Sequence, residues 1–208
     1  MTDVGRQDWK KDLRALYSPP SRPTVVDVPA MRFLMLDGHG DPNTEPRYRE
    51  VIEALFSLAY TVKFAARAES SADFAVYPLE GLWWVPDMRE FTIERKTDWD
   101  WTMMIAQPEP VTSQLVEEAR SKATAKKGLA PLGEVRFEQF TEGRCAQVMH
   151  TGPFAAEAPV IEGVHAFIRD LGGELAGKHH EIYLSDPRRT AQEKLRTVIR
   201  QPFTGGRA

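Results

Sequence analysis

The segment HHEIYLSD, residues 179–186, combines imidazole, carboxyl and phenol groups in a strand-like alternation. In an extended strand alternate side chains share a face, so His179, Glu181 and Tyr183 would lie together, opposite His180 and Ile182. An ionised carboxylate is rarely buried without a partner, so Glu181 is a candidate functional group. We expect the apolar Ile182 side to face helices. Glu181 and Tyr183 would then face the other side, where two halves of the chain would enclose a cleft.

A second acidic strand candidate, YPLEGLWW, places Glu80 close to Trp83 and Trp84. The intervening Gly81 suggests a bulge, which leaves the facing of the following residues open. The segment WDWTMMI adds Trp101 and Met103 on one face of a further strand. Aromatic rings and methionines around carboxylates suit a flat, apolar or weakly basic ligand.

Ordinary structural roles compete with this interpretation. Tryptophan and methionine in strands are commonly core residues. Glu80 could be a surface residue or accept hydrogen bonds from a turn, and Glu181 could form an ion pair with Arg136 or Lys178.

Other kinds of chemistry find little support in the sequence. His179 and His180 are adjacent in a strand and would point to opposite faces, so we expect no metal site there. Cys145 has no activating neighbours in the sequence. Serine–histidine–aspartate triads and glycine-rich phosphate loops have no motif, and no cofactor is expected.

Composition narrows the class of protein. The 208 residues carry a net charge of −3 without a basic block, so nucleic-acid binding is not expected. A single cysteine suits a reducing compartment. The polar N-terminus lacks an apolar signal region, and no apolar stretch reaches membrane-spanning length. We therefore expect a soluble, cytoplasmic protein; the sequence does not set its oligomeric state.

The elements that position these side chains follow a repeated order. The first half predicts strands over 24–28 and 31–37, a helix over 47–66, and strands over 74–85 and 99–107. A linking helix over 112–127 follows. The second half predicts strands over 134–140 and 144–152, a helix over 155–171, and strands over 179–186 and 195–203. This order predicts an N-terminal arm, residues 1–21, with a possible short docked helix. One α+β domain, 22–208, would follow, with half-repeats 22–110 and 134–204 and helices against one sheet face.

Five blocks together carry a family resemblance: VPAMRFLMLDGHGDPN, LAYTVKF, YPLEGLWW, WDWTMMIAQP and KHHEIYLSDPRRT. From about Tyr17 to Phe203, the chain resembles the GyrI-like small-molecule-binding family, and more narrowly its stand-alone members of the cyclopropanoid hydrolase type. The resemblance implies an SHS2-type fold of two βαββ units related by a pseudo-twofold axis. Between them would lie an aromatic cleft with a central acidic residue, matched here by Glu181. Relatives include effector-binding domains of multidrug-sensing activators; a regulatory role here would need a separate DNA-binding partner.

The resemblance also implies an activity, the addition of water to an electrophilic cyclopropane in xenobiotic or genotoxin detoxification, without a cofactor. Glu181 would be the general base or orient the water, Tyr183 would donate to the ligand carbonyl, and Glu80 would be a second acid–base group. The remaining expected ligand contacts are Trp83, Trp84, Trp101, Tyr60, Met103 and His179. The alternatives are a non-catalytic protein that binds or sequesters drugs or effectors, and a protein-binding module.

Overall fold

The computed structural model describes residues 8–70 and 72–207. Short helices α1 (Trp9–Asp12) and α2 (Arg14–Tyr17) precede the first strands. The first half contains β1 (Thr24–Val28), β2 (Met31–His39), α3 (Pro46–Ser70), β3 (Leu79–Trp84) and β4 (Asp100–Gln107). Helix α4 (Ser113–Lys127) links the halves. The second half contains β5 (Arg136–Phe140), β6 (Gly143–Thr151), α5 (Ala158–Asp170), β7 (Gly173–Leu175), β8 (His179–Tyr183) and β9 (Arg196–Gly205).

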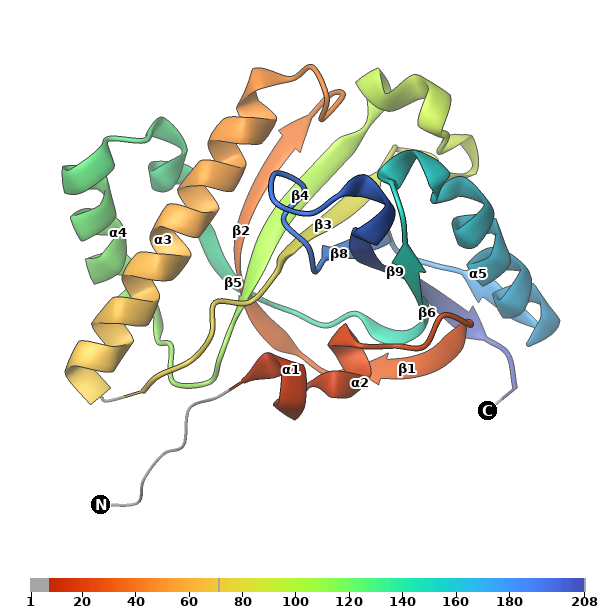
Figure 1. Ribbon diagram of the computed structural model, residues 1–208, viewed down its shortest axis with the longest axis horizontal. Helices are drawn as coiled ribbons and strands as arrows, with labels where there is room; N and C mark the ends of the chain where they lie inside the picture. The colour runs from red at the N-terminus through yellow and green to blue at the C-terminus, as the bar shows by residue number, and fades with distance from the viewer. Residues whose placement is uncertain (1–7, 71, 208) are drawn as a thin grey trace.

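One large antiparallel sheet joins the two halves (Figure 1). Its strand order is β1-β6-β9-β8-β3-β4-β2-β5, with β7 paired to β9 outside this path. Each half supplies a βαββ unit, β2-α3-β3-β4 in the first and β6-α5-β8-β9 in the second. The units meet at β3 and β8, and the strand order is symmetric about that pair. The predicted α+β fold with tandem βαββ units is confirmed.

The first strand of each half pairs with the outer strand of the opposite βαββ unit. β1 pairs with β6 of the second unit, whereas β5 pairs with β2 of the first. Both pairings are antiparallel, so the exchange extends the sheet at both ends.

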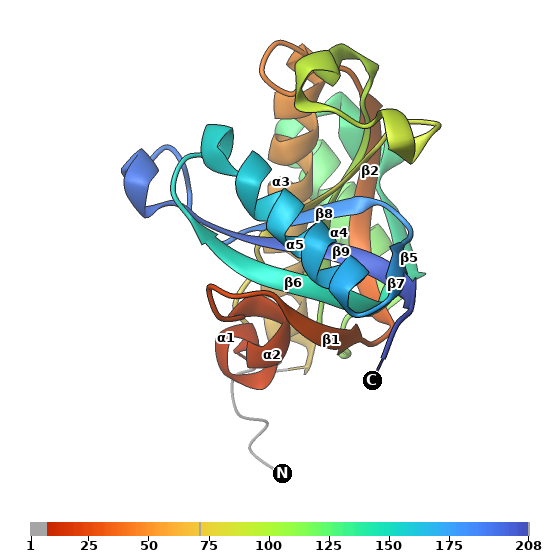
Figure 2. The same ribbon diagram turned by 90° about the vertical axis from the view of Figure 1, so that its right-hand side faces the viewer.

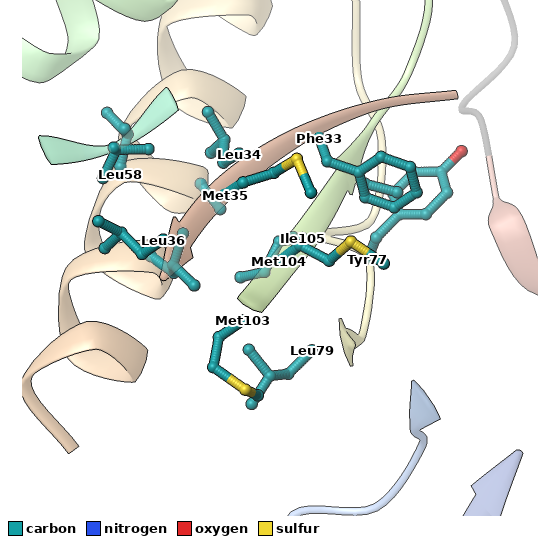
Figure 3. Close-up of a cluster of buried hydrophobic side chains, with 14 of the residues drawn as sticks. Phe33, Leu34, Met35, Leu36, Leu58, Tyr77, Leu79, Met103, Met104 and Ile105 are labelled. Atoms are coloured by element: carbon teal, nitrogen blue, oxygen red, sulfur yellow. The ribbon is translucent and has the colours of Figure 1, made fainter. Parts of the chain in front are cut away.

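Helices α3 and α5 cover the same face of the sheet (Figure 1). On that face Leu36 of β2 packs near Leu58 of α3. Phe33, also on β2, points to the opposite face, near Tyr77 (Figure 3). Helix α5 lies across β6 and β9, where Val164 and Ile168 pack on Val148 and Ile199 (Figure 2).

The N-terminal arm covers part of the opposite face. Trp9 and Tyr17 are buried there, with ring centroids 5.2 Å apart, and both contact Tyr77. The Trp9 indole nitrogen donates to the Val76 carbonyl. The predicted short helix is found as α1 and α2, which meet at Leu13; residues 1–7 of the predicted arm lie outside the described residues.

Several elements differ from the sequence-based expectation: α3 continues to Ser70, and β8 ends at Tyr183. The strand predicted from residue 74 begins at Leu79, and the three-residue strand β7 was not predicted. Among the described residues, no helix combines the length and apolar character needed to cross a membrane.

Candidate functional site

The centre of the site is the pair of residues that face each other where the two halves meet. Gly81 of β3 lies opposite Glu181 of β8, with Trp83 opposite His179. A Cβ atom on residue 81 would lie 2.8 Å from Nε1 of Trp83 and 3.3 Å from Cε of Met103. The missing side chain therefore makes room for the Trp83 indole, which turns towards β8.

Both carboxylate oxygens of Glu181 have partners from its own strand face. Nε2 of His179 lies 3.1 Å from Oε1, and the hydroxyl of Tyr183 donates to Oε2 over 2.8 Å. The side chain is 14% exposed, so it is largely buried but keeps some contact with solvent. Burial raises the pKa of Glu181, but His179, Tyr183 and the more distant Lys96 outweigh it and leave the pKa below its ordinary value. Glu181 is therefore an ionised carboxylate.

Two tyrosines border this carboxylate and stay protonated. Burial, followed by the charge of Glu181, raises the pKa of Tyr183 and of Tyr48. Tyr48 comes from the first turns of α3, and its ring lies 6.0 Å from that of Trp83 and 5.3 Å from that of Trp101. The site therefore contains phenolic donors beside the ionised acid.

A second carboxyl group, Glu157, belongs to the same site. It lies in the turn that precedes α5 and is only 4% exposed. Burial and the charge of Glu181 raise its pKa to about 9, against the opposing effects of Thr197 and Lys96. Its Oε1 makes no hydrogen bond of standard geometry with the described residues. At neutral pH Glu157 is a protonated acid beside an ionised one, the arrangement by which proteins separate a general acid from a general base.

Aromatic rings surround the two acids. Phe91 stacks on Trp99 at 4.8 Å and lies 5.9 Å from the ring of His179. Phe154, which is 42% exposed, contacts Tyr183 edge to face at 5.8 Å. These rings come from the segment before β4 and from the turn before α5, so both halves of the chain supply rings near Glu181.

The predicted alternation along β8 is correct, but the predicted facing is wrong. Ile182 lies opposite Glu80 of β3, which accepts a hydrogen bond from Tyr17 of the arm, whereas Glu181 pairs across the sheet with Ile199, which packs with α5. Glu181 therefore lies on the helix face. The apolar side of β8 is covered by the N-terminal arm rather than by α3 or α5.

Glu80 lies on that opposite face and does not share the site. Its carboxylate accepts a 2.8 Å hydrogen bond from the Tyr17 hydroxyl and lies 3.0 Å from Nε2 of His180. His180 also lies 2.9 Å from Glu142, which pairs with Arg200 at 3.2 Å. The predicted acid–base role of Glu80 is therefore wrong, since it belongs to a buried charge network that joins β8 to the arm.

Of the other predicted ligand contacts, some lie at the Glu181 site and some lie elsewhere. The Glu181 cluster consists of Glu181, His179, Tyr183, Trp83, Tyr48 and Glu157. Trp83 and His179 were predicted correctly as neighbours of Glu181. Trp101 and Met103 are fully buried behind the cluster, where Trp101 contacts Tyr48 and Met103 lies near Gly81. Tyr60 is 50% exposed on α3 and is not among the contacts of this site, so that prediction is not supported.

Trp84 points to the opposite face from Trp83 and lines a separate cavity. Lys178 lies over its ring, and Arg136 binds Asp37, so neither cation is the partner of Glu181.

Glu157, Phe91 and Phe154 were not predicted as site residues. Each lies in an irregular segment, where hydrophobic periodicity carries no signal. Tyr48 lies within the helix predicted over 47–66 but was not predicted as a site residue. Burial raises the pKa of the Cys145 thiol, in agreement with its expected lack of reactivity. Among the described residues, no cluster of three histidine, cysteine or acidic side chains could hold a metal ion.

Solved structures with the same fold include three proteins from Listeria innocua. An uncharacterized conserved protein is 38% identical to this chain, with a TM-score of 0.88 over 95% of this chain and 99% of its own. A hydrolase is 36% identical, with a TM-score of 0.83 over 95% and 99% of the two chains. A hydrolase encoded by lin2189 is 37% identical, with a TM-score of 0.86 over 96% of this chain and 100% of its own.

A comparison with curated proteins found no match. Residues 21–203 match the GyrI-like small molecule binding domain. This match spans both βαββ units and every residue of the Glu181 cluster. The chain is therefore a member of the GyrI-like small-molecule-binding family.

Proposed function

We propose that this protein binds flat, electrophilic small molecules at Glu181 and hydrolyses them by adding water, with cyclopropanoid compounds as the substrate class. The observation that carries the proposal is the pair of buried acids: His179 and Tyr183 hold Glu181, while Glu157 is 4% exposed and its Oε1 makes no hydrogen bond with the described residues. This environment lowers the pKa of Glu181 and raises that of Glu157 to about 9. A protein that only binds apolar ligands has no need to bury a neutral acid beside an ionised one.

The proposed reaction uses both acids at once. Glu181 takes a proton from a water molecule as its oxygen forms a bond to the ring methylene of a spirocyclopropyl-dienone. The strained carbon–carbon bond breaks, and its electron pair moves into the dienone, which becomes a phenolate. Glu157 gives its proton to that oxygen, so the net change is the addition of one water. Proton exchange with solvent then restores the starting state of both acids.

Other residues prepare the reacting groups. The hydroxyl of Tyr183 donates to Glu181 and keeps the carboxylate oriented, while Trp83, Phe91 and Phe154 supply ring faces for a flat ligand. Apolar walls also strengthen the electrostatic interactions that act on developing charge. The similar Listeria proteins described as hydrolases support a hydrolytic reaction, although their substrates are not specified.

Glu181→Gln tests the proposal directly, because the amide keeps the shape of the side chain and loses the basic oxygen. Hydrolysis of a spirocyclopropyl-dienone, followed by its absorbance, should fall by about a hundredfold to ten-thousandfold. Ligand affinity, measured by tryptophan fluorescence, should change little. Tyr60→Ala is the matched control, since Tyr60 is exposed outside the site, and it should retain full activity. Equal turnover in Glu181→Gln would remove Glu181 from the role of base.

The second candidate is a protein that binds or sequesters ligands without catalysis. It is favoured by the ionised Glu181 among aromatic rings, an environment that also suits a lipophilic cation. If the unmutated protein binds the dienone tightly without hydrolysing it, this second function replaces the first for that ligand class.

A further inference from the structure

A cavity of about 280 Å³ lies on the sheet face opposite Glu181. The paired strands β3, β4, β2 and β5 form its floor, with Leu82 opposite Thr102, Thr102 opposite Asp37, and Met35 opposite Arg136. The lining residues are Met35, Asp37, Leu82, Trp84, Thr102, Arg136, Glu138, Gln139, Phe140 and Lys178. Its volume is near the lower limit for small-molecule sites, so it suits a ligand of one or two rings.

The ammonium group of Lys178 is held over an aromatic ring inside this cavity. Its Nζ lies 3.1 Å from the centroid of the Trp84 ring. Among the described residues, no carboxylate lies within 4.0 Å of this nitrogen, although Asp37 and Asp100 act on it from farther away. Lys178 is partly buried, and burial lowers its pKa. The cavity therefore contains a cation that has a ring partner but no bound counter-ion.

The acidic groups of the cavity are already engaged. Both oxygens of Asp37 accept hydrogen bonds from Arg136, at 2.7 and 2.8 Å, and one also accepts from the Thr102 hydroxyl at 2.7 Å. Glu138 accepts from the other terminal nitrogen of Arg136 at 2.8 Å. Two carboxylates thus bind the guanidinium, which leaves Lys178 as the group in the cavity that can meet a ligand's charge.

We propose that this cavity is a second binding site, separate from the Glu181 site, for a small aromatic carboxylate. The carboxylate would pair with the Lys178 ammonium above Trp84, and the flat ring would lie against Phe140 and the part of the Trp84 side chain that the ammonium leaves uncovered. A charge-assisted hydrogen bond in a partly desolvated place is stronger than one between neutral groups. Leu82 and Met35 would bury the remaining apolar surface of the ring.

Three ligands that share one ring system and differ in charge test the role of Lys178. The probes are 2-naphthoate, its neutral amide 2-naphthamide, and the cation 2-naphthylmethylammonium. Calorimetric titration of the full chain should give affinity in the order carboxylate, amide, ammonium. Lys178→Gln should weaken 2-naphthoate by about tenfold or more and abolish its advantage over the amide. Trp84→Leu should weaken the carboxylate and the amide alike, because both lose the ring contact.

Glu181→Gln controls for binding at the other site and should leave 2-naphthoate affinity unchanged. Circular dichroism and thermal unfolding establish that Lys178→Gln and Trp84→Leu remain folded. The proposal is overturned if 2-naphthoate does not bind at millimolar concentration, or if Lys178→Gln binds it as well as the parent does. It is also overturned if the ammonium probe binds better than the carboxylate, or if Glu181→Gln alone removes binding. None of these outcomes depends on whether the Glu181 site hydrolyses cyclopropanes.

Discussion

The indole nitrogen of Trp83 donates a hydrogen bond of 3.1 Å to the hydroxyl oxygen of Tyr183. Tyr183 has a single proton, which it donates to Oε2 of Glu181 over 2.8 Å. Trp83, from the first half of the chain, therefore sets the direction in which Tyr183, from the second half, donates. Because His179 lies at the other oxygen, both carboxylate oxygens of Glu181 have a partner, and the side chain is largely buried.

Tyr183→Phe should move the acid side of the activity profile to higher pH. The lost hydrogen bond no longer lowers the pKa of Glu181, so the base becomes protonated, and inactive, at a higher pH than in the parent. The pH dependence of kcat/KM measures this shift. Trp83→Phe is the matched comparison, since it keeps the bond to Glu181 and should shift the profile less. An unchanged acid limb in Tyr183→Phe would contradict the assigned contact.

Glu157→Gln should lower the rate by about a hundredfold to ten-thousandfold, because the amide cannot supply the proton. In the parent, activity should decline as pH rises through about 9, where Glu157 ionises, and this alkaline limb should be absent from the residual activity of the variant.

The same variant should be more stable than the parent at neutral pH. Because the folded-state pKa of Glu157 is raised to about 9, the unfolded chain releases its proton first, and stability falls as pH rises towards that value. Thermal unfolding at pH 5 and pH 8 tests the sign. The gain should be larger at pH 8; an equal or smaller gain would show that Glu157 is not held as a neutral acid.

Gly81→Ala should disturb the site without touching either acid. The new methyl group would lie 2.8 Å from Trp83 Nε1, so the indole must move and lose its hydrogen bond to Tyr183. Such overpacking costs about 1–3 kcal/mol in the free energy of unfolding. Gly163→Ala in α5 is the matched control, since nothing lies within 4 Å of its Cβ position, and it should be neutral or stabilising. Denaturant titration and tryptophan fluorescence follow both variants.

Glu142→Gln should destabilise the protein through the network behind β8. Burial alone would lower the pKa of His180, but Glu142 and Glu80 raise it to about 9. The contribution of protonated His180 to stability is complete below about pH 6.5 and is lost as pH rises through about 9. Breaking this buried pair should cost about 3–5 kcal/mol at neutral pH and make the decline of stability between pH 6.5 and 9 shallower.

Denaturant titration across that range measures both effects of Glu142→Gln. Glu193→Gln, at an exposed position, is the control and should behave like the parent. A variant as stable as the parent at neutral pH would show that the network contributes nothing to folding.

Periodicity was sufficient to predict α3, α5 and most of the strands, because the stripes of the helices and the alternation of β8 are local properties; it did not predict the three-residue strand β7. It also placed His179, Glu181 and Tyr183 on one face. Which way that face points is not a local property, since the side of β8 that contains Ile182 meets Tyr17 of the distant N-terminal arm through Glu80. Apolar character shows that a side is buried, and it does not show by what.

Two further differences have the same origin. Gly81 does not form the expected bulge, because pairing with β4 and β8 continues through it without interruption. Its role is to leave space for the Trp83 ring, which depends on the rotamer of Trp83. Glu157 lies in a turn, and only tertiary contact places its buried carboxyl beside Glu181.

The crossed pairing of β1 and β5 limits how the protein can open. A fragment that ended in the segment after α4 would leave β1 without β6, and the remaining fragment would carry β5 without β2. The arrangement resembles an arm exchange between two subunits, enclosed within a single chain. Hinge separation of the halves would have to break these pairings together with the β3–β8 seam. Ligand access to Glu181 is therefore expected through movement of the loops that contain Phe91 and Phe154, while the two halves remain locked.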